Sequence, residues 1–202
     1  MLASRHATLH GMTVPLSTSV VSADSANSLA TVRIVGFDPG LNITGYGVIE
    51  CTGSRVKLVE AGCIRSRGEG LAERLLTIHR GVQEVLETFQ PSAMAIEQLF
   101  VHGRFPKTAI LMGHARGVIC LAAGQVGLTV HDYLPNRVKS MLTGSGHAKK
   151  PQMQAAVQRE LGLARPPTPA DAADALAVAI ADYHLRLRPL RTSFSNNLSA
   201  RP

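Results

Sequence analysis

The sequence predicts an α/β domain with a mixed five-stranded sheet flanked by helices. Three strand-like runs follow one another over residues 31–64, and beyond them stretches of helical periodicity alternate with two short apolar runs. This order of elements is typical of a central sheet that is covered by helices. A chain of 202 residues is long enough for one such core with an extension at each end.

The first three strands are the runs TVRIVGFD, TGYGVIE and VKLVEAGCI. Pro39-Gly40 and Thr52-Gly53-Ser54 separate them, and both combinations favour tight turns. Strands joined by short turns predict an antiparallel meander.

Helices and strands alternate in the remainder of the chain. A helix that stops at Pro91 is predicted by apolar residues spaced alternately four and three apart, which are Leu71, Leu75, Ile78, Val82, Val85 and Phe89. AMAIEQ predicts a buried fourth strand, and a helix is expected over about 106–125. TVHDYL predicts the fifth strand, and further helices are expected over 137–142, over 151–161 and from near Pro169.

Composition indicates a polyanionic partner. The formal net charge is +7, and no basic amphipathic helix stands out, so nucleic acid is favoured over a lipid surface. The three cysteines lack the spacing of a zinc site, and their number and separation favour a reducing, cytoplasmic location. The most apolar stretch, ILMGHARGVICLAAG, is interrupted by His114 and Arg116 and is too short to span a bilayer, so no membrane partner is expected.

Both ends of the chain are expected to be extensions of the folded domain. Residues 1–31 are rich in Ser, Thr and Ala and are predicted to be disordered. A native extension, an organelle transit segment and a start site placed too far upstream all fit them. Residues 187–202 mix Arg, Pro, Ser and Asn and predict a basic flexible tail, which leaves 32–186 as the domain.

Four acidic residues occupy positions that globular proteins usually avoid. Asp38 ends the first strand, Glu97 ends the run AMAIE, and Asp171 and Asp174 open the last helix. Ionised carboxylates beside an apolar core cost solvation free energy unless cations neutralise them. If the four side chains converge, their oxygens suit Mg²⁺ or Mn²⁺ and the metal-assisted hydrolysis of a phosphodiester.

Each acid also has a structural explanation. Asp38 precedes Pro39-Gly40 and could be a turn former. Asp171 could complement the dipole of a helix with Thr168 as its N-cap. Glu97 and Asp174 are harder to explain in this way, because a charge beside buried apolar neighbours needs a partner.

Five sequence blocks occur in an order known from one protein family: GFDPGLNITGYGVIE, AIEQLF, GHARGV, RVKSMLTGSGHAKK and DAADALAVAIADYH. Over about residues 32–184 the chain therefore resembles the RuvC family of Holliday junction resolvases. The resemblance implies a ribonuclease H-like fold and an endodeoxyribonuclease that resolves four-way junctions by paired symmetric nicks in recombination and repair. It also implies that Asp38, Glu97, Asp171 and Asp174 are catalytic and hold two Mg²⁺ ions, for which Mn²⁺ can substitute.

The same resemblance implies how DNA and partner proteins bind. Lys139 and Lys150 match lysines that the family uses on DNA, and Phe100 matches an aromatic residue that stacks on a base near the junction centre. Further DNA contacts are expected from Arg104, Lys107, Arg137, His147 and Lys149. The structural alternatives are a solvated charged surface and a core phenylalanine.

Protein partners follow from the family as well. RuvC proteins dimerise through the region that contains Gly113 and Gly117, and they act with the RuvA and RuvB branch-migration proteins. Packing of this helix against its own sheet would explain the two glycines equally well.

Two other classes of function fit parts of the chain. A junction-binding protein that never cuts would share the basic residues. An actin-like ATPase also begins with a strand, an Asp-x-Gly turn and a hairpin, as in GFDPGLNITGYG. That class needs two large lobes, and this chain is too short to be more than a fragment of such an enzyme.

Overall fold

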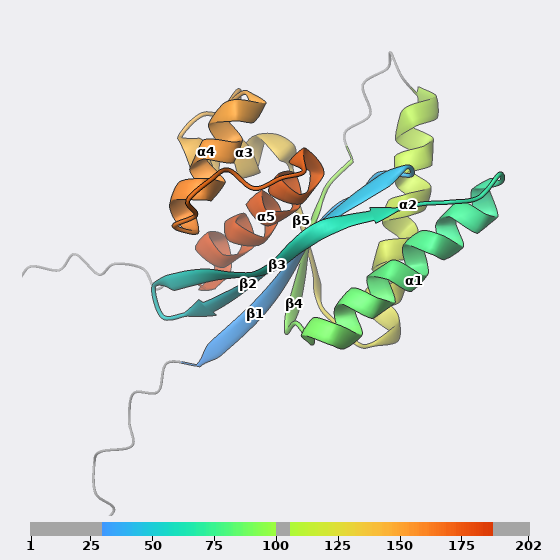
Figure 1. The fold of residues 1–202 in the computed structure, drawn as a ribbon, viewed down its shortest axis with the longest axis horizontal. Helices are drawn as coiled ribbons and strands as arrows, with labels where there is room; N and C mark the ends of the chain where they lie inside the picture. Colours follow the sequence, from blue (N-terminus) through green and yellow to red (C-terminus); the bar gives the residue numbers. More distant parts are fainter. Residues whose placement is uncertain (1–29, 100–105, 188–202) are drawn as a thin grey trace, which may run out of the picture.

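A mixed five-stranded sheet forms the centre of the molecule (Figure 1). The computed structural model describes residues 30–99 and 106–187, so Phe100, Arg104 and most of both predicted extensions lie outside the described residues. The strands are β1 (Thr31–Asp38), β2 (Ile43–Thr52), β3 (Arg55–Arg65), β4 (Ala93–Glu97) and β5 (Val130–Tyr133). Thr31 is the first residue of β1, as the run TVRIVGFD predicts, so the N-terminal extension ends before residue 31 and not at it.

The strand order is β3-β2-β1-β4-β5. The predicted meander is confirmed, because β1 and β3 both pair antiparallel with β2. On the other side of β1, strands β4 and β5 run parallel to it. The carboxyl ends of β1 and β4 therefore meet at one edge of the sheet.

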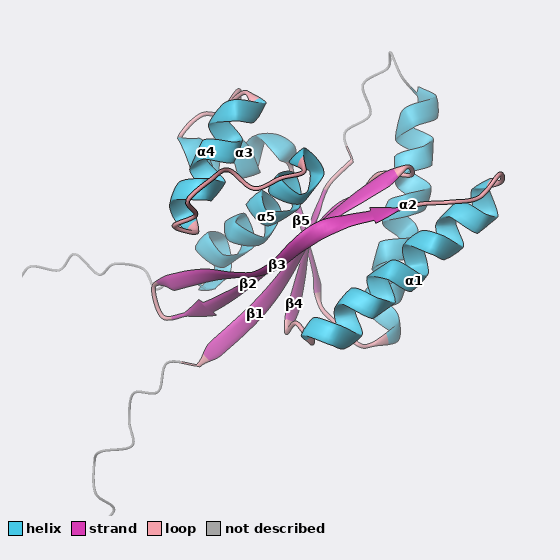
Figure 2. Cartoon of the chain, viewed as in Figure 1, coloured by secondary structure: helices cyan, strands magenta, loops and turns pink. Residues whose placement is uncertain are grey.

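Helices cover both faces of the sheet, as Figures 1 and 2 show. One face carries α1 (Leu71–Phe89) and α2 (Pro106–Gln125). The other face carries α3 (Pro135–Thr143), α4 (Lys150–Glu160) and α5 (Ala170–Asp182), and α5 continues into a π-helical turn, η2 (Tyr183–Leu187). The N-cap of α5 is Pro169 and not Thr168 as predicted.

Two apolar clusters hold these layers together because successive strand residues point to opposite faces. Val35 and Phe37 of β1 pack toward α1 and α2, whereas Ile34 packs toward α5. Every residue of α5 from Ala172 to Asp182 is buried except Asp174. A helix that is apolar on nearly all sides is a core helix, which makes a half-buried acid within it unusual.

None of the described helices combines the length and the apolar character that a membrane span requires. All three cysteines are free thiols.

Candidate active site

Asp38 and Glu97 lie side by side at the carboxyl edge of the sheet. The parallel pairing of β1 with β4 includes Phe37 opposite Ile96, and Asp38 and Glu97 are the next residues of their strands. Phe37 and Ile96 belong to the cluster under α1 and α2. By strand alternation, both carboxylates therefore point to the opposite face, where α5 lies.

Helix α5 approaches this edge closely because the strands beneath it carry glycines. A Cβ atom at Gly36 of β1 would lie 2.1 Å from the carbonyl oxygen of Ala175, and one at Gly45 of β2 would lie 2.0 Å from the carbonyl oxygen of Asp171. Gly45 pairs directly with Asp38. The absence of a side chain at Gly45 thus lets the first turn of α5 rest on the end of β1.

These glycines were missed as site residues from the sequence. Alternate glycines in TGYG were a usable signal, since glycine inside a strand often marks close approach of another backbone. The sequence did not show which backbone approaches, because α5 lies more than 120 residues further along the chain.

The four predicted acids share one electrostatic field. Burial, followed in order of importance by the neighbouring charges of Glu97, Asp174 and Asp171, raises the pKa of Asp38 to about 7. Burial, and then the charge of Asp174, raises the pKa of Glu97 to about 7. Burial likewise raises the pKa of Asp174, with Asp171 adding to the effect. The fold therefore gathers carboxylates that were distant in sequence into one mutually repelling group.

Two of the predicted DNA-binding lysines lie next to this group. The Nζ atom of Lys150, the first residue of α4, is 3.7 Å from Oδ2 of Asp174. The positive charges of Lys139 and Lys150 lower the pKa of Glu97, which partly offsets the effect of burial. Basic side chains therefore border the acids on the side of α3 and α4.

Three further residues that were predicted to bind DNA are on the surface. Arg137 of α3, His147 of the α3–α4 loop and Lys149, the N-cap of α4, are exposed. The hydroxyl of Thr143 donates to the carbonyl oxygen of Lys139 at 2.8 Å and accepts from the amide of Ser145, which orders the start of this loop. Arg137, His147 and Lys149 thus add three exposed basic side chains to α3, to the start of α4 and to the loop between them.

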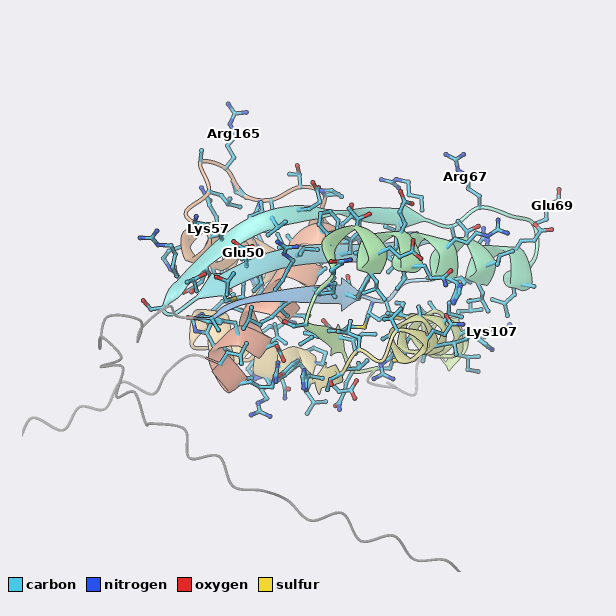
Figure 3. The ribbon with its side chains drawn as sticks, turned by 90° about the horizontal axis from the view of Figure 1, so that it is seen from below. Glu50, Lys57, Arg67, Glu69, Lys107 and Arg165 are labelled. Carbon is cyan, nitrogen blue, oxygen red and sulfur yellow. The ribbon has the colours of Figure 1, made fainter. Side chains whose placement is uncertain are left out.

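Lys107 differs from these residues because it lies on α2. Figure 3 shows its side chain projecting outward at the N-terminal end of that helix. Its charge is not among those that shift the pKa values of Asp38, Glu97 and Asp174 in the described part of the chain.

The donor set fits a hard divalent cation in its chemistry. Asp38 and Glu97 are half-buried carboxylates with raised pKa values, and burial of a negative charge without a full counter-charge favours cation binding. Within the described parts of the chain, no three acidic, histidine or cysteine side chains are grouped so that they could hold one ion together. Mg²⁺ does not need such a group, because it is commonly bound through one or two carboxylates and completes its shell with water and phosphate oxygens.

Comparison with known proteins decides the family. The sequence model described as "Crossover junction endodeoxyribonuclease RuvC" matches residues 34–182. The chain belongs to the RuvC family. That span contains all four acids together with α3, α4 and most of the sheet.

Relatives in the RuvC family cover nearly the whole domain. The protein named crossover junction endodeoxyribonuclease RuvC in Rhodopirellula baltica is 49% identical over 176 residues, which are 87% of this chain and 97% of the relative. The protein of the same name in Azoarcus sp. is 46% identical over 160 residues, or 79% of this chain and 86% of the relative.

Solved structures agree with this RuvC assignment. The Thermus thermophilus RuvC structure superposes with a TM-score of 0.69 at 36% identity and covers 76% of this chain and 95% of that one. The structure of the same protein in complex with a Holliday junction substrate superposes with a TM-score of 0.70 at 36% identity. It covers 74% of this chain and 92% of that one. The yeast mitochondrial Holliday junction resolvase superposes with a TM-score of 0.54 at 10% identity, which shows a shared fold and no more. The predicted ribonuclease H-like architecture is confirmed.

Proposed function

We propose that this member of the RuvC family is a metal-dependent endodeoxyribonuclease that resolves four-way DNA junctions by paired symmetric nicks. The observation that carries the proposal is the electrostatic coupling of Asp38, Glu97 and Asp174 at the edge where α5 meets β1 and β4. Family membership supports it, because the curated relatives are named crossover junction endodeoxyribonucleases.

Asp38, Glu97, Asp171 and Asp174 are the residues we propose as the metal ligands. They would hold two Mg²⁺ ions, or Mn²⁺ in their place, which supply the charge that favours attack of water on a phosphodiester and departure of the 3′ oxygen. Cleavage of that bond leaves a 5′-phosphate and a 3′-hydroxyl. The two carboxylates at the strand ends are fixed by the sheet, and the two on α5 are fixed by the contacts of Gly36 and Gly45, so the fold presents all four from rigid elements.

DNA would be held by the basic surface beside the acids. We propose that Lys139 and Lys150 contact phosphates nearest the scissile bond and that Arg137, His147 and Lys149 bind the flanking backbone. Lys107 would approach the junction from the side of α2. Phe100 and Arg104, which lie outside the described residues, are proposed as further DNA contacts from the family resemblance. Stacking of an aromatic side chain on an unpaired base contributes about 1 to 3 kcal/mol, which would favour an opened junction over closed duplex.

A homodimer would match the near two-fold symmetry of a four-way junction. Helix α2 has exposed apolar residues Ile110 and Leu121 on the stripe that includes Gly117, and a Cβ at Gly117 would meet no atom within 4 Å. We propose that a second copy of the chain packs on this stripe. We also propose cytoplasmic action together with RuvA and RuvB, as the resemblance implies.

The test is cleavage of a labelled four-way junction in the presence of Mg²⁺. Asp38→Asn and Asp174→Asn should each abolish cutting while junction binding is retained, because the grip on DNA and the chemistry use different residues. Glu87→Gln, an exposed acid on α1, is the control and should cut normally. Unchanged cutting by both site variants would refute the proposal. A parent protein that binds junctions and never cuts them would be a binding protein instead.

A further inference from the structure

Among the basic residues that the structure describes, Lys150 lies nearest an acid of the candidate site. Its Nζ atom is 3.7 Å from Asp174 Oδ2, longer than a hydrogen bond, and its side chain is 74% exposed, against 29% for Asp174. Of the four acids, Asp174 alone forms a side-chain ion pair within the described residues. The pair thus joins a loosely held cation to a firmly placed carboxylate.

The charge of Lys150 acts on more than its direct partner. It opposes the rise in pKa of Asp38, Glu97 and Asp174, and Lys139 does the same for Glu97 and Asp174. These two ammonium groups face four carboxylates, so the free enzyme offsets only part of the negative charge at the edge of the sheet. Lys150 therefore neutralises part of the negative charge of the carboxylates, and a divalent cation would neutralise more of it.

The position of Lys150 makes this role exchangeable. Four rotatable bonds and high exposure let its ammonium leave Asp174 at little cost. A dication bound at Asp174 would repel the ammonium, and a phosphate of bound DNA would attract it. Both effects move the side chain in the same direction.

Resting on the function proposed above, we infer that Lys150 is an internal counterion of Asp174 that is exchanged for a divalent cation when junction DNA binds. In the free protein, Lys150 lowers the affinity for metal. When the junction is bound, a DNA phosphate pairs with the ammonium of Lys150 and the divalent cation binds the carboxylate of Asp174. Because coupling between two ligands is reciprocal, metal and DNA then each strengthen the binding of the other.

The test is a Mn²⁺ titration followed by electron paramagnetic resonance, with and without an uncut junction. In the free protein, Lys150→Gln should bind Mn²⁺ about threefold to tenfold more tightly than the parent protein, because one competing positive charge is gone. The gain in Mn²⁺ affinity that the junction gives should be smaller in Lys150→Gln than in the parent. Lys150→Arg keeps the charge and should stay close to the parent.

Lys149→Gln is the matched control. It removes the same charge one residue away, and Lys149 forms no ion pair with the described acids. In the free protein, where the proposed contact of Lys149 with DNA is absent, its Mn²⁺ affinity should therefore remain within about twofold of the parent value. Parent-like Mn²⁺ affinity in Lys150→Gln, or an equal tightening in Lys149→Gln, would overturn the exchange. Cleavage by the parent protein with Mg²⁺ separates this failure from failure of the nuclease proposal, which would instead appear as an absence of cutting.

Discussion

Gly45 and Asp171 are in direct backbone contact although 126 positions separate them. A Cβ atom at Gly45 would lie 2.0 Å from the carbonyl oxygen of Asp171, and the nearest atoms are backbone atoms that cannot rotate away. We expect Gly45→Ala to displace the first turn of α5 from the end of β1. Junction cleavage should fall by more than tenfold, because the acids on α5 would be displaced. The added methyl group should also overpack this contact and lower the free energy of unfolding by about 1 to 3 kcal/mol.

Gly70 provides the control for this substitution. It precedes α1 with a negative φ, and a Cβ there would meet no atom within 4 Å. Gly70→Ala should therefore retain cleavage, and because Gly70 is the N-cap of α1, its loss of stability should be no more than about 1 kcal/mol. Full cleavage activity in Gly45→Ala, measured with a saturating junction, would show that the contact of α5 with Gly45 does not set the geometry of the acids.

The stability of the metal-free protein should depend on pH because of Asp38 and Glu97. Their pKa values are about 7 in the folded protein, against 3.8 and 4.5 for the unperturbed groups. Between those values the folded state binds more protons than the unfolded state, so these two groups make the free energy of unfolding fall as the pH rises from about 4 to 7. Above that window their contribution is constant and unfavourable, and bound Mg²⁺ should offset it.

Urea unfolding with a chelator at pH 5 and pH 8 measures this effect. In the double variant Asp38→Asn, Glu97→Gln, the loss of stability between the two pH values should be smaller than in the parent by on the order of 1 to 2 kcal/mol. The variant should also be the more stable protein at pH 8. An identical fall in both proteins would mean that the two carboxylates are not strained by burial and mutual repulsion.

The elements that carry the acids could be predicted from local sequence, whereas their convergence could not. Strand runs and helical spacing are local patterns, so the bounds of β1, β4 and α1 matched closely. Asp38 and Glu97 could be proposed as metal ligands from the sequence because each ends an apolar run. Their common field depends on how α5 packs, and that depends on glycines whose contact partner is a distant backbone.

Asp182 shows the same limit away from the site. The sequence drew no attention to it, yet its side chain is fully buried at the end of α5. Tyr133 of β5 donates its hydroxyl to Asp182 Oδ1 at 2.7 Å, and Arg186 donates to both oxygens at 2.7 and 2.9 Å. From sequence alone, an acid at the end of the last helix would be expected to face solvent. Its burial results from the packing of β5 and η2 around it, which local sequence does not show.

This buried network should contribute strongly to stability. Arg186→Met would leave the carboxylate of Asp182 with one charge partner fewer in an enclosed site, and we expect a loss of about 3 to 5 kcal/mol in the free energy of unfolding. Tyr133→Phe removes a single hydrogen bond and should cost about 1 to 3 kcal/mol. Urea denaturation measures both values.

A partly exposed ion pair supplies the comparison. A guanidinium nitrogen of Arg33 lies 3.0 Å from Oε2 of Glu50, and each side chain is about one third exposed. Glu50→Gln should cost less than about 1 kcal/mol. Equal losses in Glu50→Gln and Arg186→Met would contradict the view that enclosure, and not pairing alone, makes the Asp182 network important.

Binding to DNA should become less sensitive to salt when a phosphate contact is removed. Lys150→Ala should weaken junction binding and reduce the slope of log affinity against log salt concentration by about one. Fluorescence anisotropy at several salt concentrations measures this slope. The parent slope in Lys150→Ala would exclude a phosphate contact by this lysine.

The apolar stripe of α2 should control both assembly and the pairing of nicks. Leu121 is 57% exposed, and we expect Leu121→Glu to shift the protein toward monomer in light scattering, because a charge would be buried at the two-fold contact. Leu76 of α1 is 48% exposed outside the stripe, so Leu76→Glu should keep the parent mass. On a plasmid with an extruded cruciform, paired nicks give linear DNA and single nicks give open circles. Leu121→Glu should therefore yield open circles where Leu76→Glu yields linear product, and linear product from a monomeric Leu121→Glu protein would separate paired cutting from assembly through α2.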